Sequence, residues 1–158
     1  NKLEVSIYEQ AHTNILSGIN NSTLNPKLWT YKTFKTDIRL EPYLHHNLPK
    51  AIYCNIAHFR LSSHNLNIEL GRHKRPFVPA EERLCEKCNL NLVEDENHCL
   101  MICPKWNDIR TTLFNIGCTF IEGFSVLHPS EQFHRILASK EVELNIALGK
   151  FLLVALKI

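Results

Sequence analysis

Three cysteines and one histidine near the middle of the chain have the spacing of a four-ligand metal site. Cys85 and Cys88 form a Cys-x-x-Cys pair, His98 follows after nine further residues, and Cys103 follows after four more. A tight Cys-x-x-Cys turn brings two thiolates to the separation that Zn²⁺ needs for bonds of about 2.3 Å, and an imidazole with a third thiolate completes a tetrahedron. The spacing predicts one structural Zn²⁺ bound by Cys85, Cys88, His98 and Cys103.

A metal ion is expected here because residues 83–103 are too poor in apolar side chains to form their own core. Those side chains are Leu84, Leu90, Leu92, Val93, Leu100, Met101 and Ile102. A structural zinc site contributes an apparent ~10–16 kcal/mol at neutral pH, which is comparable to the stability of a whole domain. Since four protein ligands leave no open coordination position, the predicted site is structural and not catalytic.

Other roles for the cysteines stay open at this stage. Cys85 and Cys88 match a redox pair, although no thioredoxin-like βαβ pattern surrounds them. Cys99 and Cys103 also fit buried helical cysteines. Cys99 is an alternative to His98 as a ligand, but neighbouring residues on a helix point about 100° apart. Six cysteines permit disulfides. No signal peptide is expected in the polar, helix-patterned first 20 residues, and this expectation favours a reducing compartment.

Apolar residues recur at three- and four-residue steps over most of the remaining chain, which is typical of helices. Helices are predicted over 2–19, over about 24–38, from Pro49 with Leu66 on the inner face, from Pro104 to near Gly117, from Pro129, and over 142–158. The stretch 70–80 contains one glycine and two prolines and is expected to be a loop. Strand signals are confined to short pieces around the cysteines.

The expected fold is therefore mainly α, a helical domain with a small inserted CCHC zinc-knuckle module. We expect an N-terminal helical region over 1–82 with a basic loop at 71–75. The zinc knuckle follows over 83–104, and C-terminal helices over 105–158 pack on the first region.

The overall charge does not identify a partner. The chain has 18 Lys and Arg against 16 Asp and Glu, and a net charge of +2 is too small to imply a polyanion partner. Residues 51–119 carry eight charges of each sign, so the cysteine region is neutral. The densest basic patch is 72–75, Arg-His-Lys-Arg. No apolar run reaches the ~20 residues of a membrane span.

Further motifs flank the cysteines in a fixed order. Arg-Leu-Ser-Ser-His at 60–64 is followed by Ile-Glu-Leu-Gly-Arg at 68–72, Arg-Leu-Cys-Glu-Lys-Cys at 83–88, Glu-Asp-Glu-Asn-His at 94–98 and Cys-Pro at 103–104. This order resembles the C-terminal region of LINE-type (non-LTR) retrotransposon reverse-transcriptase proteins of animals, which carry a CCHC zinc knuckle downstream of the polymerase. The resemblance covers roughly residues 24–115. Cys99 departs from it, since an aromatic residue is commoner at that position.

The resemblance implies a module that grips template RNA or target DNA during target-primed reverse transcription. Carried over onto this sequence, the expected nucleic-acid contacts are Arg60, His64, Arg72, Lys74, Arg75, Lys87 and Lys105. His64 and Trp106 have rings that can stack on unpaired bases. The expected partners are RNA or DNA and an upstream reverse-transcriptase domain of the same polypeptide, in the nucleus or in a cytoplasmic ribonucleoprotein. Neither a membrane nor a small-molecule substrate is expected.

The residue content gives no sign of catalysis within this chain. Two-metal polymerase or nuclease chemistry needs clustered carboxylates, and the three Asp residues, Asp37, Asp95 and Asp108, stand far apart in the sequence. Gly-x-Ser-x-Gly, phosphate-loop and His-Glu-x-x-His motifs do not occur. By this test the chain is not an enzyme.

Several predicted contacts also have a purely structural interpretation. Arg60 fits a pair with a buried glutamate such as Glu69, and Trp106 fits a core position. The acidic run 94–96 fits the N-terminal cap of a short helix that bears His98. The competing hypothesis is therefore a zinc-stabilised helical scaffold, derived from a retroelement, that binds protein.

Overall fold

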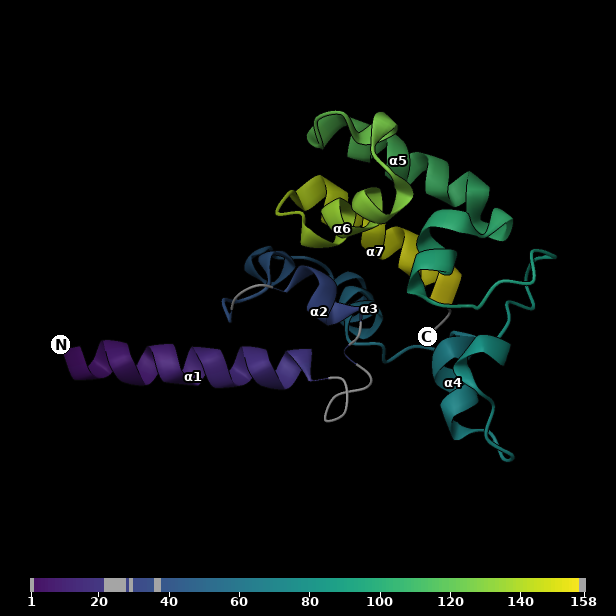
Figure 1. Ribbon diagram of the computed structural model, residues 1–158. Coiled ribbons are helices and arrows are strands. Elements are labelled where there is room, and N and C mark those ends of the chain that lie inside the picture. Colours follow the sequence, from purple (N-terminus) through teal and green to yellow (C-terminus); the bar gives the residue numbers. More distant parts are fainter. Residues whose placement is uncertain (1, 22–27, 29, 36–37, 157–158) are drawn as a thin grey trace.

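The computed structural model describes residues 2–21, 28, 30–35 and 38–156, and in that part of the chain the fold is mainly helical (Figure 1). The longer helices are α1 (Lys2–Asn20), α2 (Tyr31–Phe34), α3 (Lys50–Arg60), α4 (Asn67–His73), α5 (Asn107–Phe120), α6 (Pro129–Ala138) and α7 (Val142–Leu156). Short helical turns are η1 (Pro42–His45), η2 (Ala80–Glu82), η3 (His98–Ile102), η4 (Pro104–Trp106) and η5 (Phe124–Val126). The mainly α prediction is confirmed.

Helix α7 lies at the centre of the fold because it is apolar on nearly all sides. It packs against α3 and against α5 (Figure 1). Leu148 and Leu152 of α7 are almost completely buried, as are Ile56 of α3 and Leu113 of α5. Burial of each such side chain contributes about 1.5–3 kcal/mol, so the α3–α7–α5 contact supplies most of the core that holds the rest of the chain.

The segment that carries the cysteines joins this core mainly through its second half. Cys99, Leu100 and Cys103 belong to the buried cluster, and from the first half Cys85 belongs to it while Cys88 and Val93 pack against it. Leu90 and Leu92, near the Cys-x-x-Cys pair, remain 47% and 42% exposed. The loop between Cys88 and Val93 therefore receives little support from apolar packing.

The expected loop at 71–75 is wrong for its first three residues, because α4 continues to His73. Gly71 lies inside the helix instead of ending it. A Cβ atom at Gly71 would lie 2.6 Å from Cδ of Arg83, so the glycine is required by the close passage of that side chain. Lys74 and Arg75 follow the helix as non-helical, exposed residues.

Three other helix boundaries differ from the prediction. Helix α3 ends at Arg60, since Ser62 adopts a left-handed conformation (φ 49°), and Leu66 lies beyond this break. Helix α5 continues past Gly117 to Phe120. Gly117 lies within it because the ring of Phe124 packs 3.1 Å from the position that a Cβ would take. The predicted helix over 24–38 lies partly outside the described residues, and α2 is its described part.

Helix α1 agrees with the prediction for 2–19 and contacts α2 (Figure 1). Strand pairing in the described residues is limited to one isolated antiparallel bridge between Leu84 and Val93. Among the described helices, none combines the length and the apolar character that a membrane crossing requires.

The close contact of α7 with α3 yields a stability prediction. A Cβ added at Gly149 would lie 2.5 Å from Cγ2 and 3.2 Å from Cβ of Ile52. Gly149→Ala should therefore destabilise the protein by about 1–3 kcal/mol through overpacking, measured as the free energy of unfolding in urea. The matched control is Gly18→Ala in α1, where a Cβ meets nothing within 4 Å and a gain of about 0.5–1 kcal/mol is expected. Equal effects of the two substitutions would contradict the assigned packing.

Candidate metal centre

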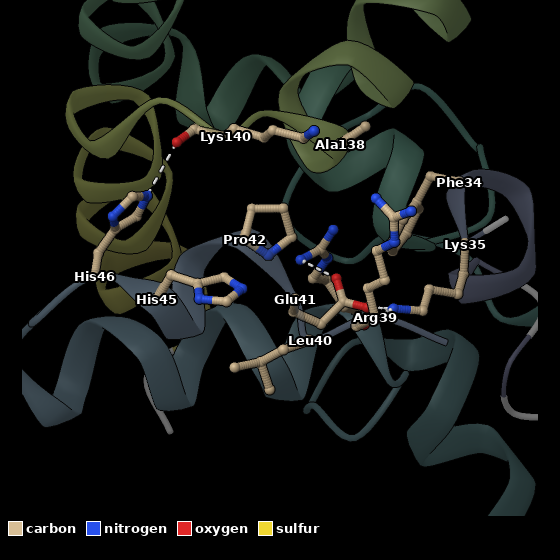
Figure 2. Close-up of a pocket in the computed structure, with 11 residues that line it drawn as sticks. Phe34, Lys35, Arg39, Leu40, Glu41, Pro42, His45, His46, Ala138 and Lys140 are labelled. Atoms are coloured by element: carbon tan, nitrogen blue, oxygen red, sulfur yellow. Dashed lines mark hydrogen bonds and ion pairs between the residues drawn. The ribbon is translucent and has the colours of Figure 1, made fainter. Parts of the chain in front are cut away.

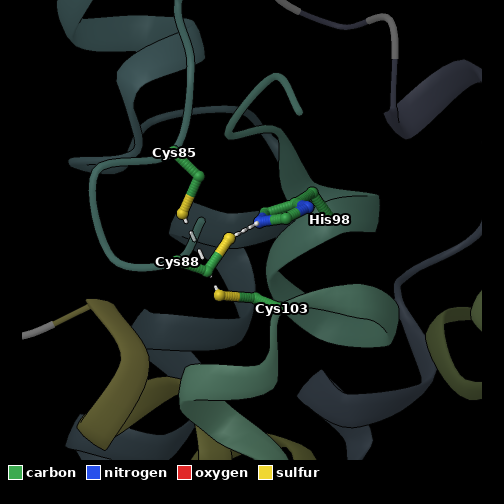
Figure 3. A group of neighbouring side chains, drawn as sticks. All are labelled: Cys85, Cys88, His98 and Cys103. Carbon is green, nitrogen blue, oxygen red and sulfur yellow. Dashed lines mark hydrogen bonds between the residues drawn. The ribbon is translucent and has the colours of Figure 1, made fainter. Parts of the chain in front are cut away.

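The four predicted ligands lie together, with one donor atom from each within 4.8 Å of all the others. Figure 3 shows the side chains of Cys85, Cys88, His98 and Cys103 converging on a common centre. The Sγ atoms of Cys85 and Cys103 are 3.9 Å apart, and Sγ of Cys88 is 3.4 Å from Nε2 of His98. The edges of a tetrahedron with Zn–S bonds of about 2.3 Å and Zn–N bonds of about 2.0 Å measure about 3.5–3.8 Å. This group can therefore hold one metal ion.

A π-helical turn brings His98 and Cys103 to the same side. Residues His98–Ile102 form this turn, and the amide of Cys103 donates to the carbonyl of His98 over 2.8 Å. In an α-helix, residues five apart in sequence face directions about 140° apart. An i→i+5 hydrogen bond closes a wider turn and places them one above the other. Pro104 then ends the turn, and the side chains of His98 and Cys103 project from it next to each other.

The turn begins with an acidic cap, as the sequence indicated for residues 94–96. The Oδ1 atom of Asp95 accepts a hydrogen bond of 2.7 Å from the amide of His98. A carboxylate at this position satisfies an amide that has no intrahelical partner and favours the positive end of the helix dipole. Asp95 therefore fixes the backbone from which the imidazole projects.

A short hairpin-like pairing presents Cys85 and Cys88. The amide of Cys85 donates to the carbonyl of Leu92 over 2.9 Å, and the amide of Glu94 donates to the carbonyl of Arg83 over 2.9 Å. Between these bonds the chain reverses through Asn91, which is left-handed (φ 52°). Asparagine tolerates this conformation better than most residues. The two thiols thus come from a tight loop whose shape rests on few hydrogen bonds.

The distances exclude a disulfide among the ligands. A disulfide requires an S–S separation of about 2.05 Å, whereas the Cys85 and Cys103 sulfurs are 3.9 Å apart. All six cysteines are free thiols. Cys99 lies outside the group of four and is packed into the core with 1% exposure, so the alternative that makes it a ligand is wrong for this geometry.

Burial sets the protonation of the ligands before any metal binds. Burial raises the pKa of Cys85 to about 12 and raises the pKa of Cys103 as well. Burial lowers the pKa of His98, which keeps its imidazole neutral and able to coordinate. A bound divalent metal ion lowers the pKa of the thiols that it binds, because it stabilises their thiolate form directly. Metal binding at this centre therefore releases protons.

A buried glutamate connects the metal centre to α4. One carboxylate oxygen of Glu94 accepts a hydrogen bond of 2.9 Å from the amide of Asn67, and the other pairs with Lys87 and lies 3.8 Å from Sγ of Cys85. The carbonyl of Glu94 accepts from the amide of Ile68 over 3.1 Å. Glu94 therefore orients the Cys-x-x-Cys loop and balances the charge of Lys87.

Arg110 of α5 holds the other side of the centre. Its guanidinium donates to the carbonyls of Leu100 (2.7 Å), Cys103 (2.6 Å) and Cys99 (3.4 Å), and to Oδ1 of Asn107 (2.8 Å). These carbonyls lie at the end of the π turn, where helix geometry leaves carbonyls short of donors, although that of Cys103 also accepts from the amide of Trp106 over 3.2 Å. One arginine therefore fixes the turn that carries His98 and Cys103 onto α5.

A second buried network links the α3–α4 connection to the metal segment. The Oε1 atom of Glu96 accepts hydrogen bonds from the hydroxyl of Ser62 (2.5 Å) and from Nε2 of His64 (3.0 Å). Nδ1 of His64 accepts from the amide of Leu66 over 3.4 Å. Since Glu96 is 1% exposed, this network fixes the start of the π turn from the side opposite to Arg110.

Among the predicted nucleic-acid contacts, Arg60 and His64 are buried. Arg60 is 3% exposed, pairs with Glu41 over 2.8 Å and donates to the carbonyl of Leu137. Its partner is thus Glu41 and not Glu69. The His64 side chain has no exposed surface in the network with Glu96. Both side chains are thus engaged with internal partners, and their contact with nucleic acid stays a prediction.

The remaining predicted contacts differ in how exposed their charge is. Lys74, Arg75 and Lys105 are exposed. Arg72 pairs with Glu69 over 3.0 Å, and Lys87 pairs with Glu94. Trp106, proposed as a stacking ring, is 8% exposed and lies in the core, which agrees with its structural interpretation.

Sequence reasoning missed the residues that position the ligands. Arg83 donates to the carbonyls of Ile68 (2.6 Å) and Val78 (2.8 and 3.0 Å), and together with Arg110, Glu94 and Glu96 it surrounds the centre. One sign of this role was present in the sequence, because these residues lie within or beside the cysteine motifs. No role was predicted for Arg83 or Arg110, whereas both are buried and donate to backbone carbonyls.

Comparison of the sequence with protein-family models gave no match, and comparisons with curated proteins and with solved structures gave none either. The resemblance to a retroelement protein therefore depends on the motifs named above, and the site is interpreted from its own geometry.

The geometry predicts one metal ion per chain, which metal analysis of the purified protein can measure. Cys88→Ser should lower the metal content well below one equivalent, because it removes a thiolate ligand. The matched control is Cys118→Ser, which changes an exposed thiol outside the group of four and should leave the content unchanged. A wild-type protein without stoichiometric metal, or equal content in the two variants, would falsify this assignment.

The contacts of Arg110 predict a loss of stability on its substitution. Arg110→Met retains most of the side-chain volume but removes the guanidinium donor from the carbonyl of Leu100 and leaves the carbonyl of Cys103 with the amide of Trp106 alone. The expected cost is about 1–3 kcal/mol, measured by urea unfolding of the zinc-loaded protein. Arg135→Met on α6 is the control, because the ion pair of Arg135 with Glu131 is exposed and is worth about 0.3–0.5 kcal/mol. A cost no larger than that of the control would refute the positioning role.

Proposed function

We propose that this chain is a zinc-stabilised helical module that binds RNA or DNA, and that it corresponds to the C-terminal CCHC region of a non-LTR retrotransposon reverse-transcriptase protein. The observation that carries the proposal is the convergence of Cys85, Cys88, His98 and Cys103 within 4.8 Å, in the order found in that family. The surrounding motifs in residues 60–104 add to the resemblance.

The ion at the centre is Zn²⁺, bound structurally, with residues 83–104 as the zinc knuckle. Three thiolates and one imidazole form a donor set that suits zinc in a closed tetrahedral site. The ion would tie the loop of Cys85 and Cys88 to the π turn of His98 and Cys103. Because Leu90 and Leu92 are largely exposed, the loop has little other source of stability, which supports a structural role for the metal.

The nucleic-acid surface is formed by exposed cations around the centre. Lys74, Arg75 and Lys105 extend into solvent, and Arg72, which pairs with Glu69, lies next to Lys74 and Arg75 at the end of α4. Arg60, His64 and Lys87 are left out of this surface because the first two are buried and the third pairs with Glu94. Exposed Lys and Arg bind phosphates by releasing condensed counterions.

The biological context follows from the same resemblance. The module would act next to a reverse-transcriptase domain of the same polypeptide and hold template RNA or target DNA during target-primed reverse transcription. It would carry out no catalysis itself and would work in the nucleus or in a cytoplasmic ribonucleoprotein.

The test is a salt titration of the affinity for single-stranded RNA and DNA. The logarithm of the binding constant should fall linearly with the logarithm of salt concentration, with a slope of roughly 0.7 per phosphate contact on a single strand. Lys74→Glu with Arg75→Glu should reduce that slope by about 1–2. The control pair is Lys50→Glu with Lys150→Glu, which makes the same charge change at exposed sites on α3 and α7.

The competing function is a protein-binding scaffold, and one observation favours it. Leu84, Leu90 and Leu92 are each about 40% exposed or more around the cysteine loop, and exposed apolar groups of this kind suit a protein partner. Absence of RNA and DNA binding at low salt would reject the nucleic-acid proposal in favour of the scaffold. An unchanged salt slope in the Lys74 and Arg75 variant would remove these residues from the surface.

A further inference from the structure

A small cavity lies where α6 packs against both α2 and the π turn η3. Its volume is about 220 Å³, and its described lining comes from three separate parts of the chain: Thr30, Thr33, Asn97, Ser130, Phe133 and His134. None of these residues belongs to the group of four at the metal centre or to the proposed phosphate-binding surface. The cavity is therefore distinct from both sites, although Asn97 directly precedes the candidate ligand His98.

The lining of this cavity includes both exposed and buried residues. Thr33 and Ser130 are exposed, whereas Thr30 and Phe133 are only 4% and 6% exposed. A bound group can therefore enter from solvent and lose much of its hydration inside. Because the volume lies below the ~300 Å³ at which typical small-ligand pockets begin, the cavity suits a single small ring better than a whole cofactor.

The lining also contains a buried hydrogen-bond acceptor without a donor. The Oδ1 atom of Asn97 is buried and has no hydrogen-bond partner in the described part of the chain. Buried polar groups are nearly always paired, and an exception requires an explanation such as a water molecule or a ligand. Since Asn97 lines the cavity, a bound group with an N–H donor would satisfy this oxygen.

The other lining groups suit an uncharged planar ligand. Among the described lining residues there is no Lys, Arg, Asp or Glu. The rings of Phe133 and His134 are tilted by 57° with their centroids 5.9 Å apart, so they are not stacked on each other. Proteins that bind single strands commonly hold unpaired bases against aromatic side chains and read their edges with polar groups. An aromatic ring and an amide oxygen occur together in this cavity.

A larger cavity of about 480 Å³ near η1 differs in character (Figure 2). Its lining is rich in charged residues, which include Lys35, Arg39, Glu41, Arg60 and Lys140. Glu41 pairs there with Lys35 over 2.5 Å and with Arg60 over 2.8 Å. These charges are thus engaged in ion pairs within the fold, whereas the described lining of the small cavity contains no ion pair and leaves one acceptor unsatisfied.

We propose that the small cavity binds one unpaired cytosine base, whose exocyclic amine donates to Oδ1 of Asn97 while its ring lies against Phe133. Cytosine and uracil have nearly the same shape, but uracil has a carbonyl oxygen where cytosine has its amine. Because two acceptors opposite each other leave both unpaired, the cavity should prefer cytosine to uracil. This inference rests on the proposed function, since the bound strand is the source of the base.

The experiment measures the affinity for oligocytidylate and oligouridylate of equal length by fluorescence anisotropy at several salt concentrations. Asn97→Leu removes the acceptor at similar size and should cost little stability, because Oδ1 loses no partner. Thr33→Phe fills the cavity from an exposed position. The controls are Asn115→Leu and Thr111→Phe at exposed positions on α5, outside the cavity. Thr111 is matched to Thr33, since both hydroxyls donate to a nearby backbone carbonyl. Circular dichroism and metal content verify the fold of each variant.

The wild-type protein should bind oligocytidylate about fivefold or more tightly than oligouridylate. Asn97→Leu and Thr33→Phe should each remove this preference without changing the salt slope, because a base contact releases no counterions. Both control variants should keep the preference. Equal wild-type affinity for the two oligonucleotides, or a preference that survives both cavity substitutions, overturns the cavity site.

The outcomes separate this inference from the proposed function. Oligonucleotide binding that depends on Lys74 and Arg75 but shows no cytosine preference overturns the cavity site and supports the proposed function. If no oligonucleotide binds, the proposed function is rejected, and a titration with the nucleosides cytidine and uridine decides the cavity site by NMR. Shifts of the Phe133 ring signals with cytidine alone, absent in Asn97→Leu, support the site; no shift means that water alone satisfies Asn97, which overturns it.

Discussion

The hydrogen bond of 2.8 Å from the amide of Cys103 to the carbonyl of His98 has consequences well beyond its own turn. It widens the helix to an i→i+5 spacing, and this spacing brings an imidazole and a thiol onto one side, opposite the Cys85–Cys88 loop. Without that turn the four ligands could not meet around one ion. The loop itself has few apolar contacts, so its position depends on what Cys85 and Cys88 bind at the candidate metal centre.

The turn is held from two sides by buried charge. Arg110 satisfies the carbonyls at its end, and Glu96 connects its start to Ser62 and His64. Buried charged groups are costly unless they are hydrogen-bonded. Arg110 donates to four acceptors, and Oε1 of Glu96 accepts two hydrogen bonds while its Oε2 has no partner. The metal centre and the helical core are therefore parts of one structure, since the residues that position the ligands come from α5 and from the α3–α4 connection.

The motifs that suggested a retroelement protein are mostly structural in this fold. Arg60, Ser62 and His64 are buried at the α3–α4 connection. Gly71 admits Arg83, and Arg83 binds carbonyls of the neighbouring segments. The residues that resemble the family motif therefore have a structural reason to occur in this order, because their contacts build the candidate metal centre. The proposed contact with nucleic acid involves lysines and arginines at the surface, whose sequence pattern is less distinctive than that of these motifs.

The amino-acid sequence by itself determined the helical class, most helix starts and the four residues that converge at the candidate metal centre. Those features depend on short-range relations: apolar periodicity, proline at the first turn, and cysteine spacing. Only the tertiary structure decided that Arg60 and His64 are buried, that Gly71 lies within a helix, and that Lys35, Arg39, Arg60 and Lys140 surround one cavity. Each of these depends on side chains far apart in the sequence, such as Arg60 and Leu137. The burial of a charge is set by the partners that folding brings to it, and local sequence carries no record of them.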